Sequence, residues 1–155
     1  MSEIFNSVNQ LEQLLEGPAW HGPSLSESLS GLSGADAAAK SIPSGHSIWE
    51  LVHHIAAWEN VVAERLGGQA VVEPAEGNFP LNVSGAEADW ADLLETLRVQ
   101  HRKLISSIAE LSDSDMDRTM VGKDHSQGVE VAGIINHLVY HTGQIALLRK
   151  ALGDR

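Results

Sequence analysis

Cysteine is absent from this chain, so it forms no disulfide, and no thiolate can serve as a metal ligand or a nucleophile. Long apolar runs are also lacking, and no stretch of the sequence is apolar enough to cross a bilayer. The first residues lack the basic and apolar segments of a secretory signal. We therefore expect a cytoplasmic protein that neither spans nor binds a membrane.

Basic residues are scarce as well. The chain has 10 Lys and Arg against 21 Asp and Glu, which gives a formal net charge of −11. A surface with this balance repels the phosphate backbone of nucleic acids and the headgroups of anionic lipids. We therefore expect no nucleic-acid partner.

The residues that are present predict an all-α protein. The chain has 155 residues, of which 43% are hydrophobic, enough for a single domain over 1–155 with a sizeable core. Apolar residues recur at helical spacing in four stretches and nowhere at strand spacing. The predicted long helices cover about 3–16, 48–66, 84–111 and 129–152. This pattern is typical of a four-helix bundle.

Serine caps predict where helices begin, and the apolar residues along each helix, its seam, predict which side chains are buried. Ser47 and Glu50 have capping-box spacing, and Ser84 with Glu87 repeats it before the third long helix. Two short helices are expected after Ser24 and around 33–40. The residues predicted to be buried on the seams are Trp90, Leu97, Leu104, Ile108, Leu138, Ile145 and Leu148.

The segment from Gly67 to about Val83 contains two prolines and little periodicity, which predicts a long irregular connection. A connection of this length can span the whole bundle. The helices before and after it therefore need not be antiparallel.

Two histidines on the last predicted helix are the main functional signal. His137 and His141 are four residues apart, so on a helix they lie on one face and can share a metal ion. A catalytic site needs a third ligand and an open position, and His54 is the best candidate for that ligand. His54 lies at the edge of its helix's apolar face, whereas His53 is expected to face solvent. Three neutral imidazoles suit zinc, nickel or iron better than calcium or magnesium.

Several alternatives remain open at this point. A histidine pair on a helix can also be one core residue and one surface residue without any metal. His101, at a core position, is expected to be a neutral imidazole with one hydrogen bond, and the alternative is a fourth ligand or proton-transfer group. Glu50 could orient His54 or remain solvated. His21 and His46 lie in predicted turns, where they could be merely exposed or could line the rim of a site.

Two stretches of this sequence resemble the DinB-like (YfiT-like) family of metalloenzymes. They are SIWELVHHIAAW at 47–58 and HLVYHTGQI at 137–145, and segments 20–25 and 146–150 are also similar to one branch of the family. The resemblance implies an up-down-down-up four-helix bundle and a divalent zinc, nickel or iron ion held by His54, His137 and His141. It also implies a homodimer as the common assembly.

The resemblance further implies a small-molecule substrate. Some relatives are transferases or isomerases that depend on a low-molecular-weight thiol, others are similar to hydrolases, and no catalytic residue can be assigned here. The alternatives are a non-catalytic metal-binding or stress-associated bundle, and a purely structural bundle whose histidines bind nothing.

Overall fold

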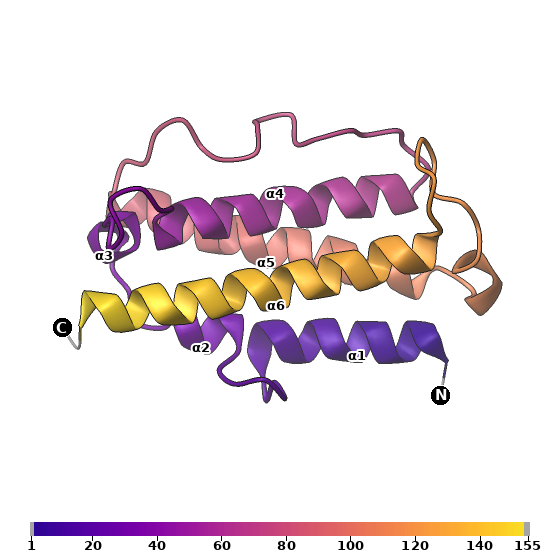
Figure 1. Ribbon diagram of the computed structural model, residues 1–155, viewed down its shortest axis with the longest axis horizontal. Coiled ribbons are helices and arrows are strands. Elements are labelled where there is room, and N and C mark those ends of the chain that lie inside the picture. The colour runs from indigo at the N-terminus through magenta and orange to yellow at the C-terminus, as the bar shows by residue number, and fades with distance from the viewer. Residues whose placement is uncertain (1, 154–155) are drawn as a thin grey trace.

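The computed structural model describes residues 2–153, and within this range the regular elements are all helices (Figure 1). They are α1 (Glu3–Glu16), α2 (Leu25–Leu29), α3 (Gly34–Ala38), α4 (Ile48–Leu66), α5 (Glu87–Ala109), the short 3₁₀ helix η1 (Asp113–Asp115) and α6 (Gln127–Leu152). The predicted all-α class is confirmed. Within residues 2–153, none of the helices has the length and apolar character of a transmembrane span.

The four long helices form a bundle in which α4 and α1 each pack against both α5 and α6. Figure 1 shows α1 and α6 running in one direction along the bundle and α4 and α5 in the other. Because α4 and α5 are parallel neighbours, the segment that joins them in the sequence must run back along the whole bundle. The connection 67–86 makes this return over the outer side of α4 (Figure 1).

The starts of α4 and α5 differ from each other. Ser47 Oγ accepts a hydrogen bond from the Glu50 amide at 3.2 Å, and Glu50 Oε2 accepts one from the Ser47 amide at 2.6 Å, so the predicted capping box is confirmed. The predicted cap at Ser84 is wrong, because α5 begins at Glu87 after Ala86, which provides no side-chain cap. Glu87 instead accepts a hydrogen bond at 2.7 Å from the amide of Gly34 at the start of α3.

A close approach of two backbones explains why Gly34 lies at this junction. A Cβ atom at position 34 would stand 2.7 Å from the carbonyl oxygen of Gly85, well inside van der Waals contact. Only glycine therefore lets α3 approach the start of α5 this closely.

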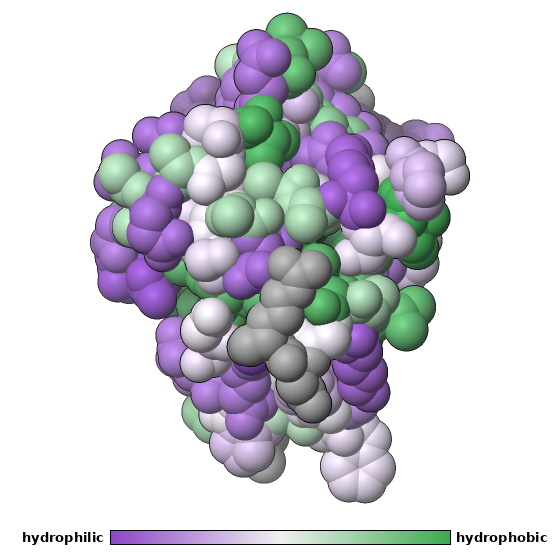
Figure 2. All heavy atoms as spheres, turned by 90° about the vertical axis from the view of Figure 1, so that its left-hand side faces the viewer, coloured by the Kyte–Doolittle hydropathy of each residue, from purple (hydrophilic) through white to green (hydrophobic). Residues whose placement is uncertain are grey.

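The core runs along the inner faces of the long helices. All seven residues predicted to be buried are at most 7% exposed: Trp90, Leu97, Leu104, Ile108, Leu138, Ile145 and Leu148. On the bundle end that faces the viewer in Figure 2, hydrophilic and hydrophobic residues are interspersed. This mixture is typical of a solvated surface.

Candidate metal centre

Three histidines from two helices converge inside the bundle. His54 lies on α4, and His137 and His141 lie on α6, which packs against α4. One ring nitrogen of each histidine lies within 4.8 Å of one from each of the other two. The Nε2 atoms of His54 and His137 are only 2.8 Å apart. The spacing of four residues on α6 brings its two rings to a centroid distance of 4.4 Å.

Hydrogen bonds orient two of the three rings. His54 Nδ1 lies 2.9 Å from the carbonyl oxygen of Asn78, and His141 Nδ1 lies 2.6 Å from Oε1 of Gln144. A carbonyl oxygen can only accept, so each Nδ1 carries the proton and donates it. Each Nε2 is then left with a lone pair, the state that a metal ligand requires.

His137 is held differently. Its Nδ1 atom is buried and has no hydrogen-bond partner among residues 2–153. Its Nε2 atom faces the Nε2 of His54. Ligand bonds of 2.0–2.1 Å in a tetrahedral zinc site put ligand nitrogens about 3.3 Å apart, so a cation would separate these two atoms by roughly half an ångström. The donor set therefore fits a divalent cation after a small movement of the rings.

All three imidazoles are electrically neutral at neutral pH. Burial lowers the pKa of His54 and of His141 below the ordinary value of 6.5. The pKa of His137 falls to about 3, chiefly through burial and then through the nearby His141 and His54. Neutral imidazoles with available lone pairs are the form that binds metal.

The connection between α4 and α5 covers one side of the cluster. The ring of Phe79 stacks between those of His54 and His46, at centroid distances of 4.4 and 3.7 Å. Asn78 accepts from His54 through its backbone, and its side-chain oxygen accepts from Trp58 Nε1 at 2.8 Å. Sequence reasoning missed Asn78 and Phe79, because an irregular segment has no periodicity that would place them.

Among the other candidates near the cluster, His53 and Glu50 differ from expectation. His53 is half-buried rather than solvent-facing, and its ring is not part of the three-histidine cluster. Glu50 neither orients His54 nor remains free in solvent, because it caps α4 and binds Lys40 Nζ at 2.5 Å. His46 is exposed and lies at the rim, where it contacts Phe79.

The remaining two candidates lie outside the cluster. His101 is buried as predicted, but it makes two hydrogen bonds instead of one: Nδ1 to Glu59 Oε1 at 2.7 Å and Nε2 to the Leu11 carbonyl at 3.0 Å. Both ring nitrogens are therefore occupied and cannot serve a metal at the cluster. His21 is exposed beside Trp20, on the turn after α1.

Comparison with known proteins agrees with this architecture. No curated protein and no solved structure matches the chain. The sequence pattern of the DinB superfamily matches residues 20–145, well over half of the chain, and this range includes all three clustered histidines. On this match, the chain belongs to the DinB superfamily.

Proposed function

We propose that this protein is a metal-dependent enzyme acting on a small molecule, with one divalent cation held by His54, His137 and His141. The observation that carries the proposal is the convergence of three ring nitrogens within 4.8 Å of one another, on two packed helices. Helix backbones position all three side chains, so the cluster is preorganised.

The nature of the donor set supports zinc, nickel or ferrous iron as the cation. Three neutral imidazoles leave the charge of a divalent cation uncompensated, which favours an anionic ligand at a fourth, open position. A cation bound there supplies Lewis acidity and lowers the pKa of a water or thiol beside it.

The surrounding residues support this chemistry by holding the ligands in place. The Asn78 carbonyl and the Gln144 side chain accept hydrogen bonds from the Nδ1 atoms of His54 and His141, which leaves each Nε2 with its lone pair. Phe79 covers one face of His54 and keeps water from it. The chain's own contribution is thus to orient lone pairs and to shield one side of the site.

Two types of reaction follow from the family resemblance: transfer that depends on a low-molecular-weight thiol, and hydrolysis. The two are distinguished by whether activity requires added thiol. An activity screen of the metal-loaded protein with and without thiols therefore assigns the type. A loaded protein that is inert in both arms would be a non-catalytic metal-binding protein.

Metal analysis of protein purified without an affinity tag tests the site itself. We expect about one zinc, nickel or iron per chain in the wild type, and loss of the metal in His54→Ala, His137→Ala and His141→Ala. His21→Ala is the matched control, because His21 is an exposed histidine outside the cluster. Equal metal content in all four variants would refute the proposed site.

A further inference from the structure

A cavity of about 310 Å³ lies between α4 and α6 and reaches the histidine cluster at His137. Its lining residues come from both helices and from the turn before α6: Trp58, Val62, Arg65, His125, Val129, Glu130, Gly133, Ile134 and His137. The volume is at the lower end of the range for small-molecule sites. Trp58, Val62, Val129 and Ile134 make most of the lining apolar. The Arg65 guanidinium lies over the Trp58 ring, 5.6 Å from its centroid.

Gly133 lines this cavity on the α6 side and is itself exposed. Among the described residues, no atom beyond its own helix turn lies within 4 Å of where a Cβ at position 133 would stand. The glycine is thus not required for helix packing, and because it lines the cavity, a bulky side chain at 133 is expected to take up part of that space.

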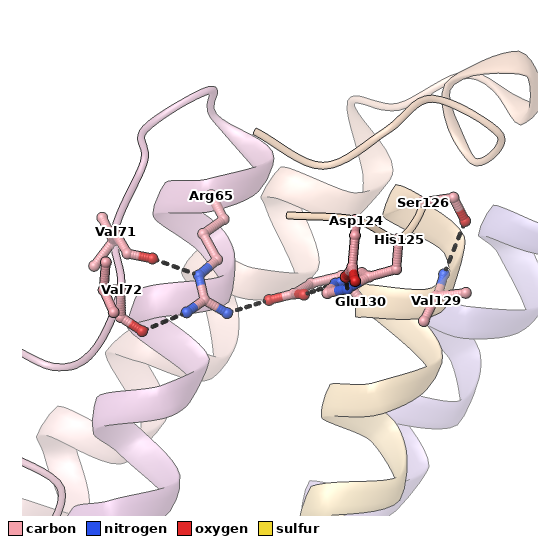
Figure 3. Close-up of polar contacts among 8 residues, drawn as sticks. All are labelled: Arg65, Val71, Val72, Asp124, His125, Ser126, Val129 and Glu130. Atoms are coloured by element: carbon pink, nitrogen blue, oxygen red, sulfur yellow. Dashed lines mark hydrogen bonds and ion pairs between the residues drawn. The ribbon is translucent and has the colours of Figure 1, made fainter. Parts of the chain in front are cut away.

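Three of the lining residues, Arg65, Glu130 and His125, form an ionic network (Figure 3). Glu130 lies in the first turn of α6, about two turns before His137, so the network lies at the other end of the cavity. Glu130 Oε1 accepts a hydrogen bond from Arg65 Nη1 at 2.6 Å, and Oε2 lies 2.6 Å from His125 Nε2. Arg65 also donates to the carbonyls of Val71 and Val72, at 2.7 and 2.6 Å. This network ties the start of the connection to the first turn of α6 and makes that end of the cavity rigid.

The charges of this network are already paired. Burial alone would raise the pKa of Glu130, but hydrogen bonds from Arg65 and His125 outweigh it and hold that pKa below its usual value. The Glu130 carboxylate therefore stays ionised and neutralises the Arg65 guanidinium. An anionic group on a ligand would meet the Arg65 guanidinium, whose charge Glu130 already neutralises, and the Glu130 carboxylate, which repels it. It would lose its hydration without gaining an ion pair in return.

We propose that this cavity binds the apolar body of an uncharged small-molecule substrate, whose electron-donating head group lies at His137 and the cation beside it. This inference rests on the proposed function and deepens it, because it names the substrate class. The substrate is compact, with a ring or branched chain that packs along Trp58. It carries no carboxylate or phosphate at the end near Glu130.

Three small-molecule ligands distinguish binding at the open metal position from binding in the cavity. Imidazole has only a head group, 4-phenylimidazole adds an uncharged ring, and 4-(imidazol-4-yl)benzoate adds an anion to that ring. Binding is followed by the visible absorption of Co²⁺-loaded protein and, independently, by the NMR cross-peak of the Trp58 indole N–H. We expect 4-phenylimidazole to bind about tenfold or more tightly than imidazole, and the benzoate to lose that gain.

Two glycine variants on α6 test the cavity directly. Gly133→Leu fills it, whereas Gly143→Leu is the matched control, because position 143 has equally open space and does not line the cavity. Gly133→Leu should keep its metal and its affinity for imidazole, but it should no longer bind 4-phenylimidazole more tightly than imidazole (the phenyl gain). Gly143→Leu should keep the metal, the affinity for imidazole and the phenyl gain. Gly133→Ala, which adds one carbon in open space, should lower the gain partially.

The failures are distinguishable. If Co²⁺ or imidazole does not bind to the wild type, the proposed function fails, and this inference fails with it. If both bind but the phenyl gain is absent, or survives in Gly133→Leu, the cavity is not the substrate pocket and the metal site stands alone. If the benzoate binds as tightly as 4-phenylimidazole, the assignment of an uncharged substrate is wrong.

Discussion

His101 Nδ1 lies 2.7 Å from Glu59 Oε1, and both side chains are shielded from solvent between α4, α5 and α1. The other ring nitrogen must carry a proton, because it donates to the Leu11 carbonyl at 3.0 Å. The proton between His101 and Glu59 is therefore shared by the pair, which is neutral overall. Glu59 Oε2 is buried with no partner among residues 2–153, so the carboxylate depends on this single imidazole.

Removing one member of this pair should destabilise the fold strongly. His101→Ala leaves a buried carboxyl group without a partner, and Glu59→Ala leaves a buried imidazole half-satisfied. We expect each to lower the free energy of unfolding by roughly 3–5 kcal/mol. Urea denaturation measures this, and a loss below about 1 kcal/mol in both variants would contradict the buried pairing. The exposed His21→Ala is the control and should be near neutral.

The same pair should make metal-free protein less stable in alkali. Burial raises the pKa of Glu59. Burial alone would lower the pKa of His101, but the hydrogen bond and charge of Glu59 raise it above 6.5. Above that pH the unfolded chain releases a proton that the folded pair retains, so stability should fall as pH rises above about 6.5. Urea midpoints across this range should show the decline, and a Glu59→Gln/His101→Leu double variant should be flatter.

The histidine cluster should respond to acid in the opposite way. Its folded pKa values are depressed, to about 3 for His137, so the unfolded chain takes up protons first as pH falls below 6.5. Metal-free protein should therefore lose stability as pH drops from 6.5 toward 3, and bound metal should be released over the same interval. Thermal melts and metal analysis after dialysis check both effects. Metal retained at pH 3 would contradict the three-imidazole site.

Adjacent histidines on α4 provide a sharp test of register. His54 Nε2 faces His137, whereas the ring of His53 lies outside the cluster. His54→Ala should lose the metal, and His53→Ala should keep it. Because His53 is half-buried with an unpaired Nδ1, its removal should change stability little. The reverse pattern of metal content would show that the ligand is His53.

Truncating either of two fully buried residues on α6 should lower the free energy of unfolding. Leu138 and Ile145 are both 0% exposed and pack in the same core cluster. Truncation of either to alanine should cost roughly 2–5 kcal/mol, because it leaves a cavity in a close-packed interior. Chemical denaturation gives the value. Leu147→Ala, exposed on the same helix, should have little effect.

The helices could be predicted from the sequence because each one carries its signals locally. Serine caps, glycine ends and three-four apolar spacing located α1, α4 and α6 to within about two residues, and the spacing of His137 and His141 placed them on one face. The pairing of His54 with them followed from helical phase and from the family resemblance.

The contacts that could not be predicted join segments that carry no such signals. Asn78 lies in a stretch without periodicity, so nothing in the sequence places its carbonyl against His54. A glutamate is usually exposed, so its residue type alone predicts that Glu59 lies at the surface. Its partner His101 is 42 residues away in the sequence. Only the packing of α4 on α5 shows that both are enclosed. His53 was placed by its helix phase alone, which ignores the neighbours that half-cover it.

The parallel arrangement of α4 and α5 has a consequence for the order of folding. Two parallel helices that are consecutive long elements cannot dock as a simple hairpin, so their contacts form only when segment 67–86 has been drawn back along the bundle. Such non-local closure slows folding. Asn78 and Phe79 belong to that segment, so the final orientation of His54 is set late. A newly made chain should therefore collapse its helices first and bring the three-histidine cluster into its full arrangement only as its last step.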